Sequence, residues 1–277
     1  MPAYSSYNTL GVSVEAGVAT VTFDHPPINL FDMTMMEELI RLGPELAADD
    51  AVRVIIFQSA DPEIFIAHAD VELIASMPAD ASRRPEQLSF FHQMLETFRL
   101  MPKVTIGKVE GRARGGGSEL LLALDMRFAA TGKALLAQPE VAIGIIPGGG
   151  GSVRLAPLIG RGRALEVILG CDDIDAQMAE RYGYVNRALP PDEIGPFVDR
   201  LARRIATFPA HAVAAAKGAV DICATLPINE ALMEEEYRFN LTLAEPETRE
   251  RMRLYMENGG QTREVELADI PLPGQPD

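Results

Sequence analysis

Alternating apolar and polar residues open the chain and predict a β-hairpin. Residues 13–24 (SVEAGVATVTFD) contain two alternating runs on either side of a central Ala-Gly pair, as expected for paired antiparallel strands. A helix should then begin at Asp32 or Thr34, because both residues can cap a helix. Residues 52–57 (VRVIIF) form a nearly continuous apolar run rich in β-branched residues, which predicts a strand buried on both faces.

Two segments have apolar residues at helical spacing. In the first helix Met36, Leu39 and Ile40 should form the buried face. In residues 90–100 (FFHQMLETFRL) the spacing again predicts a helix whose apolar side chains pack in the core. Some of these side chains could instead line an apolar ligand channel.

The middle of the chain alternates strand, glycine turn and helix. Residues 104–109 predict a strand that leads into GRARGGGSELLLALD, where three glycines precede a helix starting near Ser118. Two further strands, MRFAA and ALLA, are interpreted as a pair and lead into QPEVAIGIIPGGGGSVRL. This alternation favours an α/β fold of repeated ββα-like units.

The pattern becomes helical after Arg161, apart from a short strand near residues 185–189. Helices are expected at about 192–207, 211–224, 229–243 and 246–257. The change in pattern predicts two domains, an α/β core over residues 1–205 and a helical subdomain over 206–277.

Charge and composition narrow the class of protein. The chain has 25 Lys+Arg against 40 Asp+Glu, a formal net charge of −15, with basic residues scattered along it. Binding to nucleic acid is therefore not expected, since it needs a concentrated basic face. No stretch reaches the length of a membrane span and the first residues do not resemble a signal peptide, so a cytoplasmic protein is expected. The two cysteines and four histidines have no metal-ligand spacing, and no metal site is expected.

The glycine-rich segments do not fit the common phosphate-binding or nucleophile motifs. PGGGGSVRL lacks the lysine of a P-loop, and neither glycine segment matches G-x-G-x-x-G. Ser118 and Ser152 lack the G-x-S-x-G frame of a hydrolase nucleophile. Glycines just before a helix still let its free N–H groups approach a ligand, which is the geometry that an oxyanion hole needs.

Two glutamates stand beside these glycine turns. Glu119 follows the first glycine run directly, and Glu140 stands in QPE before the second. Either residue alone could be structural, because Glu119 could complement a helix dipole and Glu140 could be a solvated surface group. Together, in apolar surroundings, they are candidates for a general acid and a general base.

The order GGGSEL and then QPEVAIGIIPGGGG resembles the crotonase, or enoyl-CoA hydratase/isomerase, family. The similarity extends from about residue 10 to about residue 225 and includes GVATVTFDHPPINLF and IFIAHADVELI. The resemblance implies a crotonase-like spiral of ββα units, with the C-terminal α-helical subdomain serving in oligomerisation or as a lid. It also implies homotrimers, or hexamers built as dimers of trimers.

The resemblance also assigns roles to residues. It implies that the N–H groups of Ala67 and Gly116 form the oxyanion hole for an acyl-CoA thioester, and that Glu119 and Glu140 are the catalytic carboxylates. No cofactor is expected, because coenzyme A is part of the substrate. Further substrate-binding residues are expected at Ile66, His68, Ala69, Asp70, Gly115, Pro139 and Gly148. The acyl pocket should draw on residues 72–98 and on the C-terminal helices.

One residue departs from the pattern of many relatives, which have glycine where this chain has His68. If that glycine serves an unusual backbone torsion, histidine would strain the loop. Otherwise the imidazole could narrow or polarise the pocket. A tolerated structural histidine is the favoured interpretation.

These features predict an enoyl-CoA hydratase, a lyase that adds water reversibly to a trans-2-enoyl-CoA. The presence of Glu119 beside Glu140 favours hydration, whereas isomerases of the family rely on one principal carboxylate at the position of Glu140. An isomerase, or another enzyme that transforms acyl-CoA on the same fold, is the alternative. A non-catalytic acyl-CoA-binding scaffold is a hypothesis of a different class.

Overall fold

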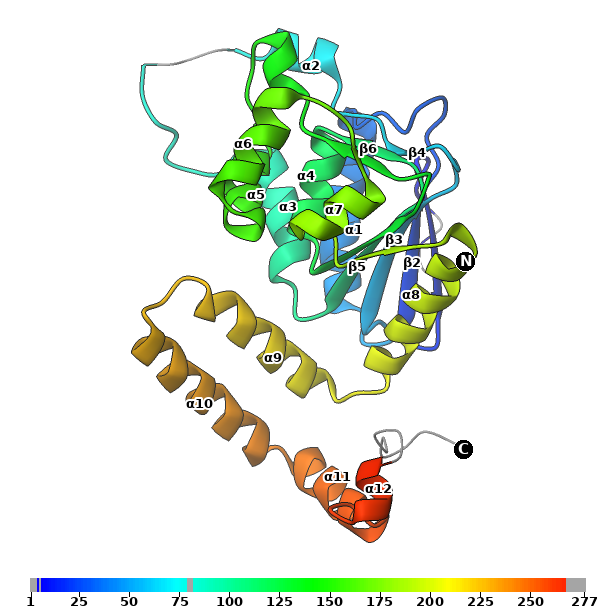
Figure 1. The fold of residues 1–277 in the computed structure, drawn as a ribbon, viewed down its shortest axis with the longest axis vertical. Helices are drawn as coiled ribbons and strands as arrows, with labels where there is room; N and C mark the ends of the chain where they lie inside the picture. The colour runs from blue at the N-terminus through cyan, green and yellow to red at the C-terminus, as the bar shows by residue number, and fades with distance from the viewer. Residues whose placement is uncertain (1–3, 5, 79–81, 268–277) are drawn as a thin grey trace. The chain divides into compact units, whose positions relative to one another are not determined.

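Strands and helices alternate along the computed structural model, which describes residues 4, 6–78 and 82–267 (Figure 1). The strands are β1 (Leu10–Glu15), β2 (Val18–Phe23), β3 (Val54–Ser59), β4 (Ile64–Ile66), β5 (Val104–Val109), β6 (Arg112–Arg114), β7 (Met126–Ala130), β8 (Leu135–Ala137), β9 (Ile174–Asp175) and β10 (Arg187–Leu189). The helices between and after them are α1 (Met33–Ala48), α2 (Val71–Ser76), α3 (Phe90–Leu100), α4 (Gly116–Ala123), the 3-10 turn η1 (Glu140–Ile143), α5 (Gly151–Ile159), α6 (Arg161–Gly170), α7 (Ala176–Tyr182) and α8 (Pro191–Ala206). The chain is therefore a mixed α/β protein, as expected from its sequence.

The described strands form two sheets. The larger has the order β1-β2-β3-β5-β7-β10 and the smaller the order β4-β6-β8-β9. The predicted hairpin is confirmed, with Val12 opposite Val21 in the antiparallel pair β1–β2. The strands from β2 to β10 in the larger sheet are parallel, and the first four residues of β3 are buried, as its continuous apolar sequence predicts.

Each repeat places one strand in each sheet and then adds a helix. β3, β4 and the helices α2 and α3 form one such repeat, β5, β6 and α4 form the next, and β7 and β8 lead into η1 and α5. The interpretation of β7 and β8 as a pair is wrong. β7 pairs with β5 and β10, whereas β8 pairs with β6 and β9. Each strand joins the parallel strand of the preceding repeat on one side and a strand from later in the chain on the other.

Helix α1 begins where its cap predicts but buries a different face. The side chain of Asp32 accepts a hydrogen bond from the backbone N–H of Met35, so Asp32 and not Thr34 is the cap. Met36 and Leu39 are buried as expected, whereas Ile40 is 40% exposed. The buried face extends through Leu42 and Leu46 instead.

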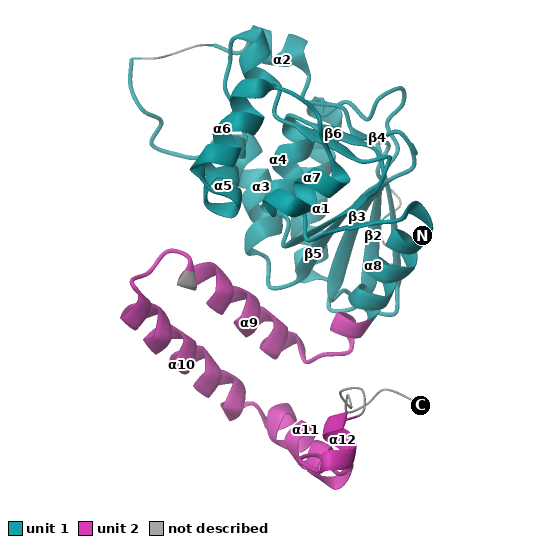
Figure 2. Cartoon of the chain, viewed as in Figure 1, with its two compact units in different colours: residues 1–203 teal, residues 204–277 magenta. Residues whose placement is uncertain are grey.

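The chain divides into two compact units, residues Met1–Arg203 and Arg204–Asp277 (Figure 2). The described helices of the second unit are α9 (Ala210–Cys223), α10 (Ile228–Ala244), α11 (Pro246–Glu257) and α12 (Arg263–Leu267). The helices expected at 211–224, 229–243 and 246–257 are therefore confirmed within a residue or two. Among the described helices, none has both the length and the apolar character needed to cross a membrane.

Candidate active site

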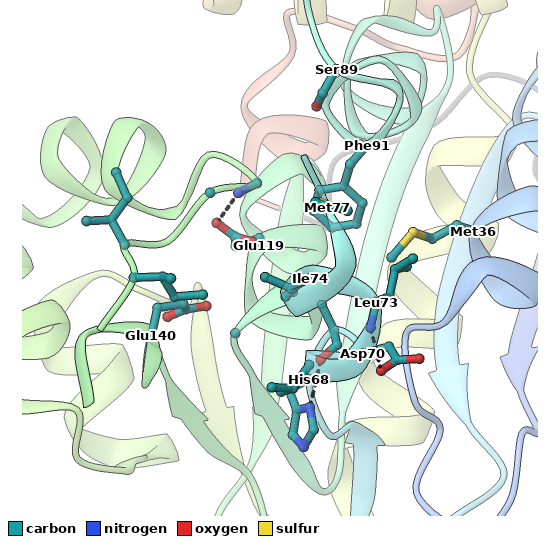
Figure 3. Close-up of a pocket in the computed structure, with 18 of the residues that line it drawn as sticks. Met36, His68, Asp70, Leu73, Ile74, Met77, Ser89, Phe91, Glu119 and Glu140 are labelled. Atoms are coloured by element: carbon teal, nitrogen blue, oxygen red, sulfur yellow. Dashed lines mark hydrogen bonds between the residues drawn. The ribbon is translucent and has the colours of Figure 1, made fainter. Parts of the chain in front are cut away.

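A pocket of about 620 Å³ lies in the first unit, between the α2–α3 region, the start of α4 and the η1 segment (Figure 3). Its walls are mainly apolar. Helix α2 contributes Leu73 and Ile74, with Met77 just beyond its end, α3 contributes Phe90 and Phe91, and the η1 segment contributes Ile143, Ile145 and Ile146. Pockets of this size and character hold small organic ligands, with a few polar groups to orient them.

The beginning of α4 supplies the first group of polar atoms. Gly115 has a φ of 49°, a backbone conformation that favours glycine, and it directs the chain into the helix at Gly116. Gly117 follows close to β4, where a β-carbon would lie 2.6 Å from the carbonyl oxygen of Ile66. The three glycines thus allow the N-terminal end of a buried helix to face the pocket.

Glu119 lies in the first turn of α4 and is 3% exposed. Its Oε1 accepts hydrogen bonds from the backbone N–H groups of Gly149 at 2.7 Å and Gly151 at 2.8 Å. Burial raises the pKa of Glu119, and these two N–H groups oppose that rise without cancelling it. The carboxyl group is therefore held firmly and has a pKa above its ordinary value.

Glu140 lies at the start of η1, directly after Pro139 and β8. It is 9% exposed, and its Oε2 has no hydrogen-bond partner among the described residues. Burial, together with the nearby Glu119, raises the pKa of Glu140 to about 7. This carboxyl group can therefore gain or lose a proton near neutral pH.

The two carboxyl groups line the same pocket (Figure 3). Their environments differ, because one oxygen of Glu119 is fixed by two backbone donors whereas Glu140 keeps an unpaired buried oxygen. Two acids with raised pKa values and different surroundings are the arrangement expected of a general acid and a general base.

Ala69 and Gly116 line the same pocket as these acids and could offer it their backbone N–H groups. A parallel bridge pairs Phe31 with Ala69 through the carbonyl of His68 and the N–H of Asp70, so the N–H of Ala69 faces away from Phe31. The nitrogen of Ala69 is 3.4 Å from the point where a β-carbon on Gly116 would stand. Both residues line the pocket, and their N–H groups could together stabilise negative charge on an oxygen.

The structure does not support Ala67 as an oxyanion-hole residue. Its N–H donates to the carbonyl of Ile28 at 3.3 Å, and Ala67 is not part of the pocket lining. Ile66, expected to bind substrate, is fully buried and also lies outside the lining. Strand β4 ends at Ile66, and this part of the chain joins the pocket lining only from His68 onward.

His68 lines the pocket without straining the loop. It is not among the described residues with positive φ, so glycine is not needed at this position. Its Nδ1 lies 2.9 Å from the carbonyl oxygen of Ala69. The remaining residues expected to bind substrate all line the pocket, namely Ala69, Asp70, Gly115, Pro139 and Gly148.

Sequence reasoning missed part of the pocket wall. Residues 72–98 were expected to contribute and do so through α2 and α3, but the three isoleucines at 143–146 were not singled out. Ile143 is 60% exposed and Ile146 is 69% exposed. An apolar run of this kind usually predicts buried residues, so their exposure could not be predicted from the sequence. The contribution expected from the C-terminal helices stays a prediction.

The described residues contain no group of three or more His, Cys, Asp or Glu side chains that could hold a metal ion. The polar groups of the pocket are instead Glu119, Glu140, His68 and Asp70, together with Ser89 and His92 of the α3 start. Ser89 Oγ lies 2.7 Å from His92 Nδ1, and Ser89 also caps α3.

Comparisons with known proteins agree with this architecture. The family model described as enoyl-CoA hydratase/isomerase matches residues 13–263. The crotonyl-CoA hydratase of Syntrophomonas wolfei is 30% identical over 253 residues, which are 91% of this chain and 96% of that protein. A solved structure from Streptomyces avermitilis, of a protein to which enoyl-CoA hydratase activity has been ascribed, is 43% identical, covers 95% of this chain and 96% of its own, and has a TM-score of 0.73.

The solved structure of an enoyl-CoA hydratase from Geobacillus kaustophilus is 30% identical and has a TM-score of 0.84. The match covers 92% of this chain and 96% of that one. The ββα repeats, the C-terminal helices and the family match together show that this chain belongs to the enoyl-CoA hydratase/isomerase, or crotonase, family.

Proposed function

We propose that the protein is an enoyl-CoA hydratase that adds water reversibly across the C2–C3 double bond of a trans-2-enoyl-CoA. The observation that carries this proposal is the presence of two buried carboxyl groups, Glu119 and Glu140, in one pocket beside the N–H groups of Ala69 and Gly116. The names of the relatives at about 30% identity support the same reaction.

The thioester carbonyl oxygen would accept hydrogen bonds from the N–H groups of Ala69 and Gly116. Charge accumulates on that oxygen as the enolate forms, so these donors act most strongly in the transition state. One such donor can be worth about 3 kcal/mol of barrier. Ala69 takes the place that the sequence alone assigned to Ala67, because the N–H of Ala67 is engaged with Ile28.

The two acids divide the proton transfers. Ionised Glu119 takes a proton from water as the water oxygen bonds to C3, and the π electrons move toward the thioester to form the enolate. Protonated Glu140 then gives its proton to C2, and the enolate collapses to the 3-hydroxyacyl thioester. The raised pKa of Glu140, about 7, supports its role as the acid, because a large fraction of the group is protonated at neutral pH.

The apolar pocket walls support an acyl group that is a hydrocarbon. Leu73, Ile74, Phe91 and the isoleucines at 143–146 would pack against methylene groups, whereas a charged acyl tail would lose its hydration there without a partner. In this mechanism the chain's own carboxyl and amide groups perform each step, and we propose that no cofactor is used.

We further propose that the protein assembles as a homotrimer or a dimer of trimers. Helix α10 presents Ile228, Leu232 and Phe239 at helical spacing, and they are 70%, 53% and 57% exposed. A second copy of the chain would cover such side chains. Sedimentation at micromolar concentration should give three or six times the mass of one chain, and the mass of a single chain would contradict the assembly.

Absorbance of the enoyl thioester tests the reaction. Crotonyl-CoA and longer trans-2-enoyl-CoAs should lose this absorbance on hydration, and chromatography should show the 3-hydroxyacyl product. Conversion of a 3-enoyl-CoA to the 2-enoyl isomer without a hydrated product would favour the isomerase, because Glu140 alone could move that proton. Binding of the whole panel without turnover would favour the non-catalytic scaffold and would overturn the proposal.

A further inference from the structure

The position of Glu119 depends on a loop thirty residues further along the chain. Both hydrogen bonds to its Oε1 come from backbone N–H groups of the glycine segment that begins α5, at Gly149 and Gly151. Gly149 and Gly151 have no side chains whose contacts could hold this segment in place. Something else must therefore fix this segment if Glu119 is to keep one orientation.

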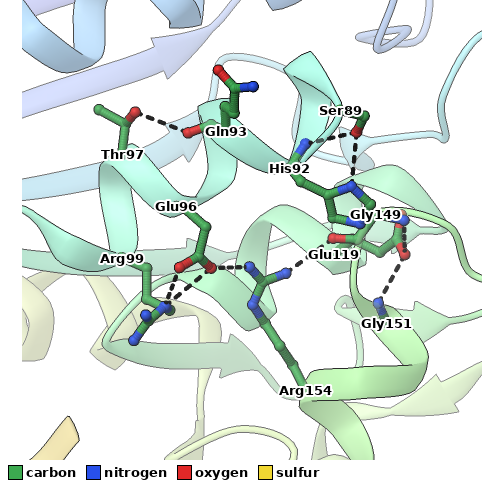
Figure 4. Close-up of polar contacts among 10 residues, drawn as sticks. All are labelled: Ser89, His92, Gln93, Glu96, Thr97, Arg99, Glu119, Gly149, Gly151 and Arg154. Atoms are coloured by element: carbon green, nitrogen blue, oxygen red, sulfur yellow. Dashed lines mark hydrogen bonds and ion pairs between the residues drawn. The ribbon is translucent and has the colours of Figure 1, made fainter. Parts of the chain in front are cut away.

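Arg154 makes that connection (Figure 4). It projects from α5, and its Nη1 donates to the carbonyl oxygen of Gly149 at 3.0 Å. Its Nη2 donates to Oε1 of Glu96 on α3, forming an ion pair. The side chain of Arg154 is 15% exposed and that of Glu96 is 23% exposed, so this pair is better shielded from water than a surface ion pair.

Glycine at position 150 leaves room for the guanidinium group of Arg154. Gly150 has a φ of 106°, and a β-carbon there would collide with the guanidinium of Arg154. The planar fork of arginine suits this place, because two of its nitrogens bond a carbonyl and a carboxylate at the same time. Lysine would carry the charge but could not reproduce the fork.

We propose that Arg154 is a positioning residue that tethers the Gly149 carbonyl to Glu96 of α3 and thereby fixes the two N–H groups that hold the catalytic carboxylate of Glu119. This inference rests on the proposed role of Glu119 as the general base. Arg154 is not part of the pocket lining and acts through Glu119.

The charge of Arg154 gives the tether a measurable signature. Burial raises the pKa of Glu119, and the two glycine N–H groups and the positive charge of Arg154 oppose that rise. The other titratable groups of the pocket are Glu140, His68, Asp70 and His92. Removing Arg154 leaves them in place and should raise the pKa of Glu119 further.

The main test compares Arg154→Met with the wild type in enoyl-CoA hydration. We expect kcat to fall by about tenfold to a hundredfold through misplacement of the base, with KM changed by less than about twofold. The acid limb of the kcat profile should move to higher pH, which a loss of stability alone would not cause. Arg154→Lys should return the limb toward its original pH while kcat stays reduced.

Arg99→Met is the matched control. Arg99 donates to both oxygens of Glu96 on the same helix, whereas the bond to the Gly149 carbonyl comes from Arg154. We expect kcat and the acid limb of this variant to match the wild type. An equal loss of kcat in Arg99→Met would place the effect in α3 and overturn the proposal. An Arg154→Met variant that folds and keeps the wild-type kcat and acid limb would also overturn it.

A second measurement does not depend on turnover. The infrared carboxyl band that disappears in Glu119→Gln reports the titration of Glu119, and in Arg154→Met this band should titrate at higher pH. An unchanged titration would overturn the proposal even if the protein hydrates no enoyl-CoA, so the two failures are distinguishable. If Arg154→Met does not fold, Glu96→Leu removes the acceptor at the other end of the tether, and a folded Glu96→Leu with wild-type kcat would contradict it.

Discussion

The backbone nitrogen of Ala69 lies 3.4 Å from the point at which a β-carbon on Gly116 would stand. Two segments separated by more than forty residues therefore present their N–H groups to one small space in the pocket. The first is aligned by its bridge to Phe31, and the second is the N-terminal end of α4. Under the proposed function the thioester oxygen occupies that space, and a side chain at Gly116 would compete with it.

Gly116→Ala should fold and lose activity. The φ of Gly116 is not positive, so alanine suits the backbone, but its methyl group would lie 3.2 Å from the β-carbon of Ala69 and 3.4 Å from its nitrogen. Impaired contact with one oxyanion donor should lower kcat by about a hundredfold. Gly162→Ala in α6, where a β-carbon meets no atom within 4 Å, is the control and should keep full activity. Equal kcat values in the two variants would contradict the oxyanion hole.

Glu140→Gln should lower kcat by about 10² to 10⁴ with little change in KM, because it removes the proton donor and keeps the shape of the side chain. Isothermal titration with a non-reactive acyl-CoA provides the binding control. A variant that keeps the wild-type rate would rule out Glu140 as the acid.

Hydration should have a bell-shaped pH dependence, since Glu119 must be ionised and Glu140 protonated. The pKa of Glu140 is about 7, so kcat/KM should fall as the pH rises above about 7. Dehydration of the 3-hydroxyacyl thioester starts from the same singly protonated pair of acids, so its kcat/KM should show the same bell-shaped profile. Measuring kcat/KM for hydration on either side of pH 7 checks this, and a kcat/KM that stays constant above pH 7 would contradict the assignment.

Glu140 should also make the fold less stable as the pH rises. The pKa of Glu140 is about 7 in the folded protein against an ordinary value of 4.5, so the folded state holds more protons between these two pH values. The stabilisation that the folded state gains from protonated Glu140 is complete below about pH 4.5 and is lost above about pH 7. The gain in Tm from Glu140→Gln should thus be larger at pH 8 than at pH 5, and a gain independent of pH would count against the shifted pKa.

Glu38 should be a pH-dependent anchor for the N-terminal strand. It is 3% exposed and accepts hydrogen bonds from Asn8 N at 2.7 Å, Thr9 N at 2.9 Å and Thr9 Oγ1 at 2.6 Å. Burial raises the pKa of Glu38, but these hydrogen bonds outweigh it and lower the pKa below its ordinary value. Its stabilisation is therefore present above about pH 4.5 and is lost as the pH falls through the lowered pKa.

Glu38→Gln should cost about 1 to 3 kcal/mol of unfolding free energy at neutral pH, measured by urea denaturation. Glu37→Gln on the exposed side of α1 is the control and should change little. A difference between the two variants that persists unchanged at pH 3 would contradict the role of the ionised carboxylate.

Local signals predicted much of the fold. The β1–β2 hairpin, α3 and the strands β3 and β5 follow from apolar spacing within each segment, which depends on near neighbours in sequence. The pairing of β7 and β8 could not be derived in this way. Their partners, β5 and β6, precede them by about twenty residues, and only the completed repeats determine which sheet each strand joins.

The site shows the same division. Glu119 and Glu140 stand beside glycine turns that are visible in the sequence, and the structure places both in one pocket. The choice between Ala67 and Ala69 depends on Ile28 and Phe31, since their pairing determines which N–H groups of the later segment are free. Such information lies in contacts between distant segments and not in the motif itself.

All eight residues of α4 are buried, including Gly116 and Glu119. The helix that holds Gly116 and Glu119 therefore has no exposed face on which substitutions could accumulate at low cost. Substitutions should cost far less stability at the exposed apolar residues of the other pocket walls, such as Met77 and Ile146. New acyl specificity should consequently evolve through those walls, while the helix beneath them retains its sequence.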